Sequence, residues 1–285
     1  MQFGPDANKE IVLPRDAATV LLLRSAPAGF EVFMVKRSGL SDVLGEAHVF
    51  PGGKVDLSDS SAAMLARVHG IETLDVAALG EALPRERAAG MFVAAARETF
   101  EEAGVLLAHG MTGDLKAARE RLNSKEPLDH VLASLDAMLD AAALLPWVRW
   151  VTPAILAKRF DARFFLALAP PEQAAVHDDH EATHSEWLSP RAALARWETG
   201  SIKLAPPTYM SLQHLAKYDG IETLLADARA RRPPVLQPVT FEEDGVRCLA
   251  LPGDARHPQP QRAIPGPTRL AWDGAKYAPT KCGAT

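Results

Sequence analysis

The stretch Arg97–Val105, RETFEEAGV, constrains this chain more than any other. It ends a long proline-free run that reads as a helix, and Gly104 is placed to terminate that helix. Glu98, Glu101 and Glu102 would share one helix face, because positions i, i+3 and i+4 are neighbours. Like charges at that spacing repel by a few tenths of a kcal/mol per exposed pair. A divalent cation bound through carboxylate oxygens would offset this repulsion, and a solvated acidic face is the alternative.

The function of the acidic helix is indicated by a second segment, Phe50–Asp56, which has the sequence FPGGKVD. Together the two segments resemble the Nudix box: a glycine, then Glu after five residues, then Arg-Glu-U-x-Glu-Glu-x-Gly-U after seven more, where U is aliphatic. Gly53 matches the leading glycine and Arg97 begins the second half. Two departures stand out. Asp59 occupies the position of the first Glu, and the spacer of seven residues runs here from 60 to 96.

A Nudix box split by a long insertion resembles the branch that contains the peroxisomal (acyl-)coenzyme A diphosphatases. The similarity continues through WVRWVTP at 147–153, RFDARFFL at 159–166 and EWLSP at 186–190. It implies an α/β fold: a Nudix-type α/β/α sandwich with a mixed central sheet, a helical insertion within the box and a Pro-rich C-terminal extension. We expect a Nudix domain over 15–220, with the insertion within 60–96, and an extension over 221–285 packed on the same domain.

The resemblance also implies roles for the acidic residues. Glu98, Glu101 and Glu102 would be ligands of Mg²⁺ or Mn²⁺, ions that suit carboxylate oxygens. Glu98, or an acid from another loop, would act as the base. Arg97 would orient the carboxylates through charge-assisted hydrogen bonds. Arg97, Glu98 and Glu101 are therefore the expected catalytic residues.

The remaining candidate positions are less specific. Gly52 and Gly53 would let the backbone approach the helix and the substrate phosphates, or would simply form a turn. Arg37, or its neighbour Lys36, would contact a phosphate group of the substrate, although basic residues at strand ends are commonly just solvated. The role of Asp59, as a metal ligand or as the partner of Arg97, is left open, with Asp56 as an alternative.

Two further acids, Glu181 and Glu186, are candidates for an extra acid late in the fold, with surface charge as the alternative. Glu181 lies within HEATH at 180–184, which matches the zinc-peptidase pattern. That pattern requires a helix, but the following Trp187 and Pro190 indicate a strand. On a strand His180 and His184 would be about 13 Å apart, too far to share one zinc ion.

The expected function is divalent-metal-dependent cleavage of the diphosphate bond in a nucleoside-diphosphate-linked compound. Coenzyme A or acyl-coenzyme A is the preferred substrate, giving 3′,5′-ADP and 4′-phosphopantetheine or its acyl derivative. ADP-ribose, dinucleotides and nucleoside triphosphates stay open as substrates. A non-catalytic ligand-binding regulator is the alternative from another class, and the three retained glutamates argue against it.

Composition and charge limit the class of protein, its expected partners and its expected location. Hydrophobic residues make up 47% of the 285 positions, as in soluble globular proteins. The net charge of −5 gives no general attraction to nucleic acid or anionic membranes, so any phosphate binding must be local. The resemblance implies a small nucleotide-type substrate as the partner. A homodimer is left open. The last residues, 281–285, do not match a Ser-Lys-Leu signal, and we expect a cytoplasmic location.

Local patterns predict the individual elements. Apolar β-prone runs at 19–23 and 30–35 flank a Pro/Gly connection and suggest a hairpin. Further strands are expected at 48–50, 163–169 and 182–188. Helices are expected over 60–69, 74–79, 85–103, 114–123, 128–143, 190–199, 207–218 and 221–228. The proline-rich remainder is expected to form extended edge strands and coil.

Overall fold

The predicted N-terminal hairpin forms the centre of the main sheet. The computed structural model describes residues 12–38, 46–80, 83–178 and 182–280. Strands β1 (Arg15–Ala26) and β2 (Gly29–Arg37) pair antiparallel, with Ala26 opposite Gly29. On its other side β1 runs parallel to β9 (Phe160–Leu168) over nine residue pairs. This long parallel pairing makes the sheet mixed, as expected.

Shorter strands extend this sheet in both directions. Its order is β11-β3-β2-β1-β9-β8-β12, with β10 also paired to β2 and β4 to β1. The bounds are Lys203–Leu204 for β11, Ala47–Val49 for β3, Leu145–Val151 for β8, Val235–Leu236 for β12, Ala182–Leu188 for β10 and Gly52–Lys54 for β4. The pairing of β4 with the first half of β1 holds the glycines of FPGGKVD beside the centre of the sheet.

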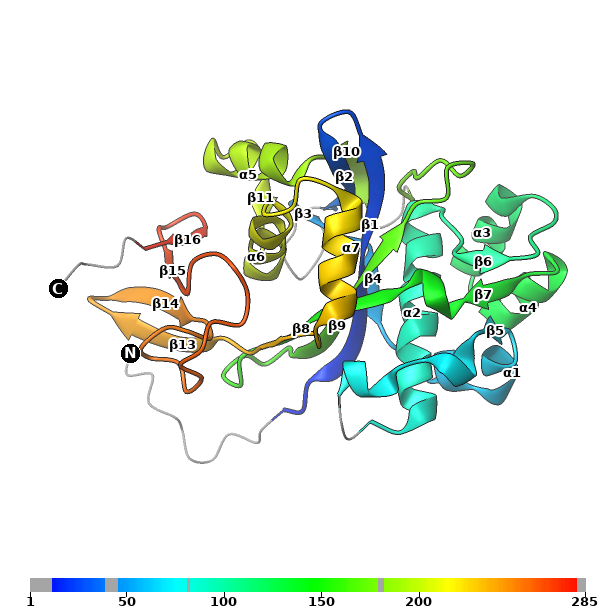
Figure 1. Ribbon diagram of the computed structural model, residues 1–285, viewed down its shortest axis with the longest axis horizontal. Helices are drawn as coiled ribbons and strands as arrows, with labels where there is room; N and C mark the ends of the chain where they lie inside the picture. Colours follow the sequence, from blue (N-terminus) through cyan, green and yellow to red (C-terminus); the bar gives the residue numbers. More distant parts are fainter. Residues whose placement is uncertain (1–11, 39–45, 81–82, 179–181, 281–285) are drawn as a thin grey trace.

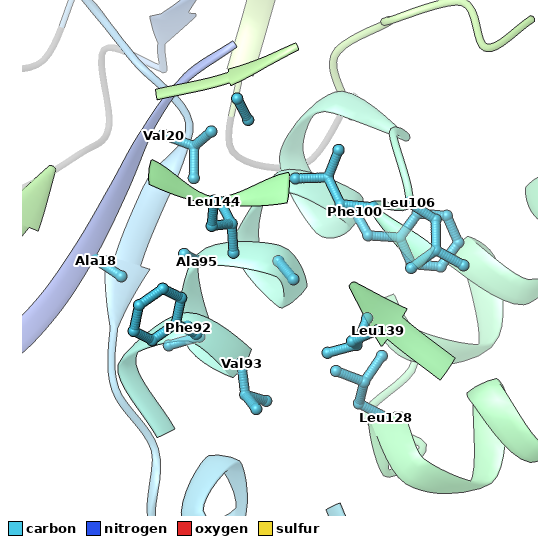
Figure 2. Close-up of a cluster of buried hydrophobic side chains, with 14 of the residues drawn as sticks. Ala18, Val20, Phe92, Val93, Ala95, Phe100, Leu106, Leu128, Leu139 and Leu144 are labelled. Carbon is cyan, nitrogen blue, oxygen red and sulfur yellow. The ribbon is translucent and has the colours of Figure 1, made fainter. Parts of the chain in front are cut away.

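Helices cover both faces of the sheet (Figure 1), because β1 is apolar on both sides. Val20 and Leu22 belong to one buried cluster, while Leu21 and Leu23 belong to another. The first cluster lies against α2 (Arg85–Ala103), and Figure 2 shows Phe92 of α2 beside Ala18 of β1. The second lies against α5 (Pro190–Glu198), α6 (Pro206–Leu215) and α7 (Ile221–Ala230). These layers form the expected Nudix-type sandwich.

The insertion packs beside α2 and not as a separate unit. Its described residues form short helical segments and a two-residue strand, β5 (Val68–His69). The helical segments are α1 (Ala62–Leu65), η2 (Ile71–Thr73) and η3 (Val76–Leu79), and η1 (Leu57–Ser60) immediately precedes them. Met64 and Val68 are buried in the first cluster. Because the insertion covers the N-terminal half of α2, that helix is buried on nearly all sides between Ala88 and Arg97.

Two helix predictions need correction in this region. The helix expected over 128–143 ends early, since α4 covers only Leu128–Ser134, and Asp136 adopts a left-handed φ of 50°. The chain then forms β7 (Met138–Asp140), followed by η4 (Ala141–Ala143). The helix expected over 60–69 is likewise cut short by β5. Together with β6 (Ala108–His109), β5 and β7 form a three-stranded sheet. Pairing between segments far apart in sequence overrides local helix propensity here.

The other helices agree with the sequence to within a few residues. Helix α2 has the predicted bounds, and α3 spans Leu115–Asn123. In the proline-rich tail, where the sequence predicted extended edge strands and coil, part of the chain forms a four-stranded antiparallel sheet of its own. Its strands are β13 (Val239–Glu243), β14 (Val246–Ala250), β15 (Arg269–Trp272) and β16 (Tyr277–Pro279). The boundary at residue 220 stays a prediction. Within the expected extension, α7 packs on the main sheet and β12 lengthens it.

Candidate active site

The last two turns of α2 carry the three glutamates of the candidate site. Gly104 ends the helix in the left-handed region, with φ of 69°, and its N–H bonds the carbonyl of Phe100. The guanidinium of Arg119 on α3 donates two hydrogen bonds, of 3.0 and 2.8 Å, to the carbonyl oxygen of Glu101. A cation at this helix end also opposes the negative end of the helix dipole. The turn bearing Glu101 is thereby held against α3.

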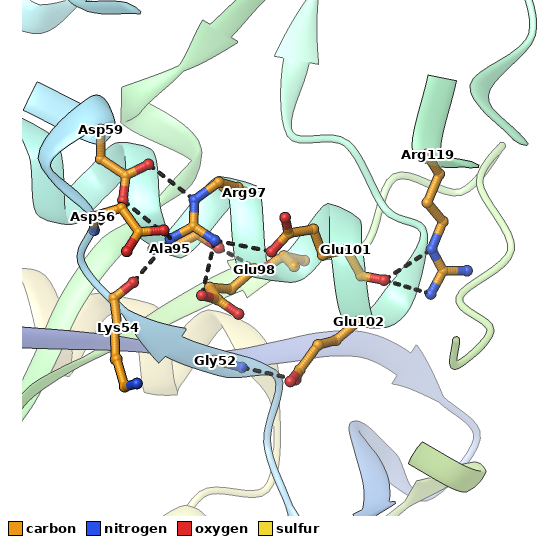
Figure 3. A network of polar contacts seen from close by, with 11 residues as sticks. Gly52, Lys54, Asp56, Asp59, Ala95, Arg97, Glu98, Glu101, Glu102 and Arg119 are labelled. Atoms are coloured by element: carbon orange, nitrogen blue, oxygen red, sulfur yellow. Dashed lines mark hydrogen bonds and ion pairs between the residues drawn. The ribbon is translucent and has the colours of Figure 1, made fainter. Parts of the chain in front are cut away.

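Arg97 is the centre of the polar network in Figure 3. Its side chain is only 9% exposed. Nη1 donates to Oε1 of Glu98 and to Oε2 of Glu101, each at 2.9 Å. Nη2 donates at 2.8 Å to the carbonyl oxygen of Lys54, at the end of β4. One guanidinium thus orients two of the glutamates and ties them to the strand that carries Gly52 and Gly53.

The structure settles where the divergent Asp59 lies. Its two carboxylate oxygens accept from Nε and Nη2 of Arg97, at 2.9 and 3.0 Å, and one of them also accepts the N–H of Asp56 at 2.8 Å. Asp59 is 2% exposed. Asp56 is the weaker partner, since its carboxylate is 3.7 Å from Nη2 and 64% exposed. Of the two roles left open for Asp59, the geometry is that of the Arg97 partner, with both oxygens engaged.

The two glycines of the first segment meet the glutamates directly. The N–H of Gly52 donates to Oε2 of Glu102 at 3.0 Å. A β-carbon on Gly53 would overlap the carboxylate of Glu98, and one on Gly52 would overlap the carbonyl oxygen of Ala18. Only glycine allows this approach. The structure therefore brings the two halves of the split motif together, although residues 60–96 separate them in sequence.

The electrostatics of this cluster leave acid in excess. Burial lowers the pKa of Arg97, but the hydrogen bonds of Asp59 and the charges of Glu98 and Glu101 outweigh it, so the pKa is raised and Arg97 stays charged. Burial raises the pKa of Glu101, and the charges of Arg97 and Lys125 only partly oppose this. Three carboxylates accept hydrogen bonds from one guanidinium, and a fourth, that of Asp56, is 3.7 Å from it. Oxygen donors with surplus negative charge are the donor set that fits Mg²⁺ or Mn²⁺.

The additional acid Glu186 lies elsewhere. On β10 it is opposite Met34 of β2, so it points to the face of the sheet away from α2. It accepts a hydrogen bond of 2.5 Å from Arg196 of α5, and its other oxygen is 3.4 Å from Nε2 of His48. The structure therefore does not bring Glu186 to the glutamates of α2. Glu181 lies outside the described residues.

Arg37 and Lys36, the two basic candidates, point to opposite faces of the sheet. Arg37 ends β2 and follows Val35 by two residues, which places it on the same face as α2. Lys36 points to the other face and forms an ion pair of 2.6 Å with Glu46. Of the two, Arg37 is on the side of the glutamates.

The zinc-peptidase pattern does not form a helix where the structure describes it. His184 lies on β10, in the strand that the sequence predicted for 182–188. His180 lies outside the described residues. The helical geometry that this pattern requires is thus missing at its second histidine.

Sequence reasoning missed three contributors to the site. The carbonyl oxygen of Lys54 carries no side-chain signal, since any residue supplies one. Arg119 and Lys125 lie on and just after α3, and neither belongs to the motif. The available hint for Arg119 was a basic residue within the helix predicted over 114–123, but only the packing of α3 on α2 brings it to Glu101.

Fold and site together define a Nudix hydrolase. The family model described as the NUDT19 Nudix domain matches residues 66–215, more than half of the chain, and the protein belongs to this family. Members of the wider Nudix family generally use divalent metals, in keeping with the donor set above. Among the described residues, no helix combines the length and apolar character needed to cross a bilayer.

Curated relatives and a crystal structure support this assignment. The acyl-coenzyme A diphosphatase NUDT19 of Gallus gallus is 28% identical over 306 aligned positions, covering 86% of this chain and 80% of the relative. The protein of the same name from Homo sapiens is 29% identical, covering 81% and 73%. A Nudix hydrolase from Alicyclobacillus acidocaldarius has a TM-score of 0.64 at 26% identity, covering 76% of this chain and 97% of that structure.

Proposed function

We propose that this protein hydrolyses the diphosphate bond of acyl-coenzyme A or coenzyme A, giving 3′,5′-ADP and acyl-4′-phosphopantetheine or 4′-phosphopantetheine. The observation that carries the proposal is the junction of the split motif, where Gly53 abuts Glu98 and Gly52 bonds Glu102. The substrate class rests on the relatives named acyl-coenzyme A diphosphatase.

In this proposal the residues of α2 have different roles in the reaction. Glu98, Glu101 and Glu102 would hold a divalent cation. When bound, Mg²⁺ or Mn²⁺ would shield the phosphate charge and make a coordinated water more acidic. Arg97 stays charged and holds the carboxylates of Glu98 and Glu101 in place. Glu98, or an acid from another loop, takes the proton of the attacking water.

The residues that would bind the substrate are proposed from their position relative to α2. The chain around Gly52 and Gly53 approaches α2 closely, with the Gly52 N–H bound to Glu102. Arg37 is on the same face of the sheet as α2, and its planar guanidinium suits phosphate oxygens. These residues would position the diphosphate.

A homodimer stays a prediction, which light scattering would test.

A substrate panel with product analysis tests the proposal. The protein is incubated with Mg²⁺ or Mn²⁺ and, in turn, coenzyme A, acyl-coenzyme A, ADP-ribose, a dinucleotide and a nucleoside triphosphate. Mass spectrometry should find 3′,5′-ADP and the phosphopantetheine product from acyl-coenzyme A, at the highest kcat/KM of the panel. Release of free fatty acid and intact coenzyme A would instead mean thioester cleavage, and higher kcat/KM for ADP-ribose would overturn the substrate class. Ligand binding without turnover of any compound would favour a regulator.

A further inference from the structure

A second group of side chains, of the kinds that can ligate a metal, lies on the three-stranded sheet. His69 ends β5, His109 ends β6 and Asp140 ends β7. His69 lies directly opposite Asp140 in the parallel pair, and His109 lies opposite Met138 in the antiparallel pair. Since residues two apart on a strand point the same way, all three side chains share one face. Figure 1 shows these strands beside α3 and α4, at the opposite end of the molecule from β13–β16.

The side chains converge closely. Nε2 of His109 is 3.1 Å from Oδ2 of Asp140. The rings of His69 and His109 are in contact, with centroids 5.0 Å apart. One potential ligand atom from each of the three residues lies within 4.8 Å of the other two. Three residues from segments separated by about 30 to 40 positions each are thus brought to one point by strand pairing alone.

Asp140 is held in place for such a role. Its Oδ1 accepts the N–H of Ala142 at 3.0 Å, at the start of η4. The other oxygen is the one turned to His109. A ligating carboxylate is commonly fixed by a hydrogen bond of this kind through its second oxygen. The two histidines are exposed, so their rings can rotate the short distance that a metal–nitrogen bond of about 2.0–2.1 Å requires.

We propose that His69, His109 and Asp140 form a site for Zn²⁺ or a similar transition-metal ion. Two imidazole nitrogens and one carboxylate oxygen match the ligands of zinc, and the exposed side leaves the fourth position to water. The donor set differs from the all-carboxylate group on α2, which favours Mg²⁺ or Mn²⁺. Bound zinc would fasten the insertion, through β5, to the two strands that follow the Nudix helix.

Zinc binding by the full chain tests this proposal. Metal-stripped protein in excess Mg²⁺ is titrated with ZnCl₂ by calorimetry, and thermal unfolding is followed in parallel. We expect one zinc equivalent and a Tm increase of about 5 °C at 100-fold excess over Kd. Co²⁺ should give the visible absorption of a four-coordinate site. Acidification should release the ion, because imidazole binds metal only when neutral.

Matched variants distinguish this site from the glutamates of α2. His109→Ala and Asp140→Asn should each abolish the zinc equivalent and the Tm increase, and asparagine can still accept from Ala142. His130→Ala, on nearby α4 and 68% exposed, serves as the control and should bind zinc normally. The triple variant of Glu98, Glu101 and Glu102 to Gln should also keep the equivalent. Zinc binding that survives His109→Ala, or that is lost with the glutamates, would overturn the proposal, as would no zinc binding at all.

Discussion

On each face of the main sheet the structure describes a group of buried or half-buried carboxylates, and the two groups differ in how many cationic partners they have. On the α2 face, Asp59, Glu98 and Glu101 share the single guanidinium of Arg97. On the opposite face, Glu186 is matched by Arg196, with His48 beside it. The charge of a carboxylate with its own cationic partner is already compensated, whereas carboxylates that outnumber their cationic partners favour the binding of a divalent cation. The contrast separates a candidate catalytic group from an ordinary ion pair, although both contain glutamates that the sequence singled out.

The largest effect is expected from a substitution in the carboxylate group on the α2 face. Glu101→Gln should lower kcat by about 10³-fold, because it removes a proposed metal ligand but keeps an acceptor for Arg97. Thermal unfolding should be nearly unchanged. Steady-state kinetics with Mg²⁺ provide the measurement. Glu186→Gln is the control on the matched side and should leave kcat within a few-fold. Equal losses in both variants would remove the distinction between the faces.

The next prediction concerns the anchor of Arg97. Asp59→Asn should lower the free energy of unfolding by about 3 kcal/mol, because it breaks a buried pair while Arg97 stays charged. Asp56→Asn should cost at most about 1 kcal/mol, since that carboxylate is 64% exposed. Urea unfolding of both variants gives the comparison. If Asp56→Asn proved the more destabilising, Asp59 would not be the main partner of Arg97.

A third prediction addresses the helical layer of the opposite face. Burial, together with the charge of Arg231, lowers the pKa of His214 from 6.5 to about 4. The unfolded chain therefore binds this proton before the folded protein does, and stability contributed by neutral His214 is lost as pH falls from 6.5 towards 4. The loss should reach about 3 kcal/mol.

Urea unfolding at several pH values measures this effect. His214→Gln should flatten the slope between pH 6.5 and 4 relative to the unmodified protein. His130→Gln, an exposed histidine, should leave the slope as it was. Identical slopes in all three proteins would show that His214 does not stay neutral in the fold.

The smallest effect is expected from substitution of the glycines where the two halves of the motif meet. Gly53→Ala should lower kcat/KM by about 10-fold with little change in stability, because the added carbon displaces the flexible Glu98 side chain. Gly52→Ala should mainly lower stability, since its added carbon meets the backbone of Ala18 and Thr19. Kinetics and unfolding of the two variants should therefore diverge. Matching profiles would contradict the different surroundings of the two glycines.

Elements whose signals are local were predictable. The bounds of α2 followed from a proline-free run after Pro84 and from Gly104, which takes the left-handed conformation that glycine tolerates. The shared face of Glu98, Glu101 and Glu102 followed from helical periodicity. The β1–β2 hairpin followed from its Pro/Gly connection. The helix expected over 128–143 failed because Leu139 pairs with Val68 and Ala108, which are distant in sequence.

The sequence by itself determined the acidic helix, the glycine segment and the family to which they belong. Only the tertiary structure decided that Asp59 pairs with Arg97, that Gly53 abuts Glu98 and that Glu186 faces away from α2. The physical reason is the range of the interactions. Periodicity and turn chemistry act over a few residues, whereas the register of β4 on β1 and of β10 on β2 places side chains that are tens of residues apart. Long-range strand pairing likewise brings together His69, His109 and Asp140, which no local sequence pattern predicted.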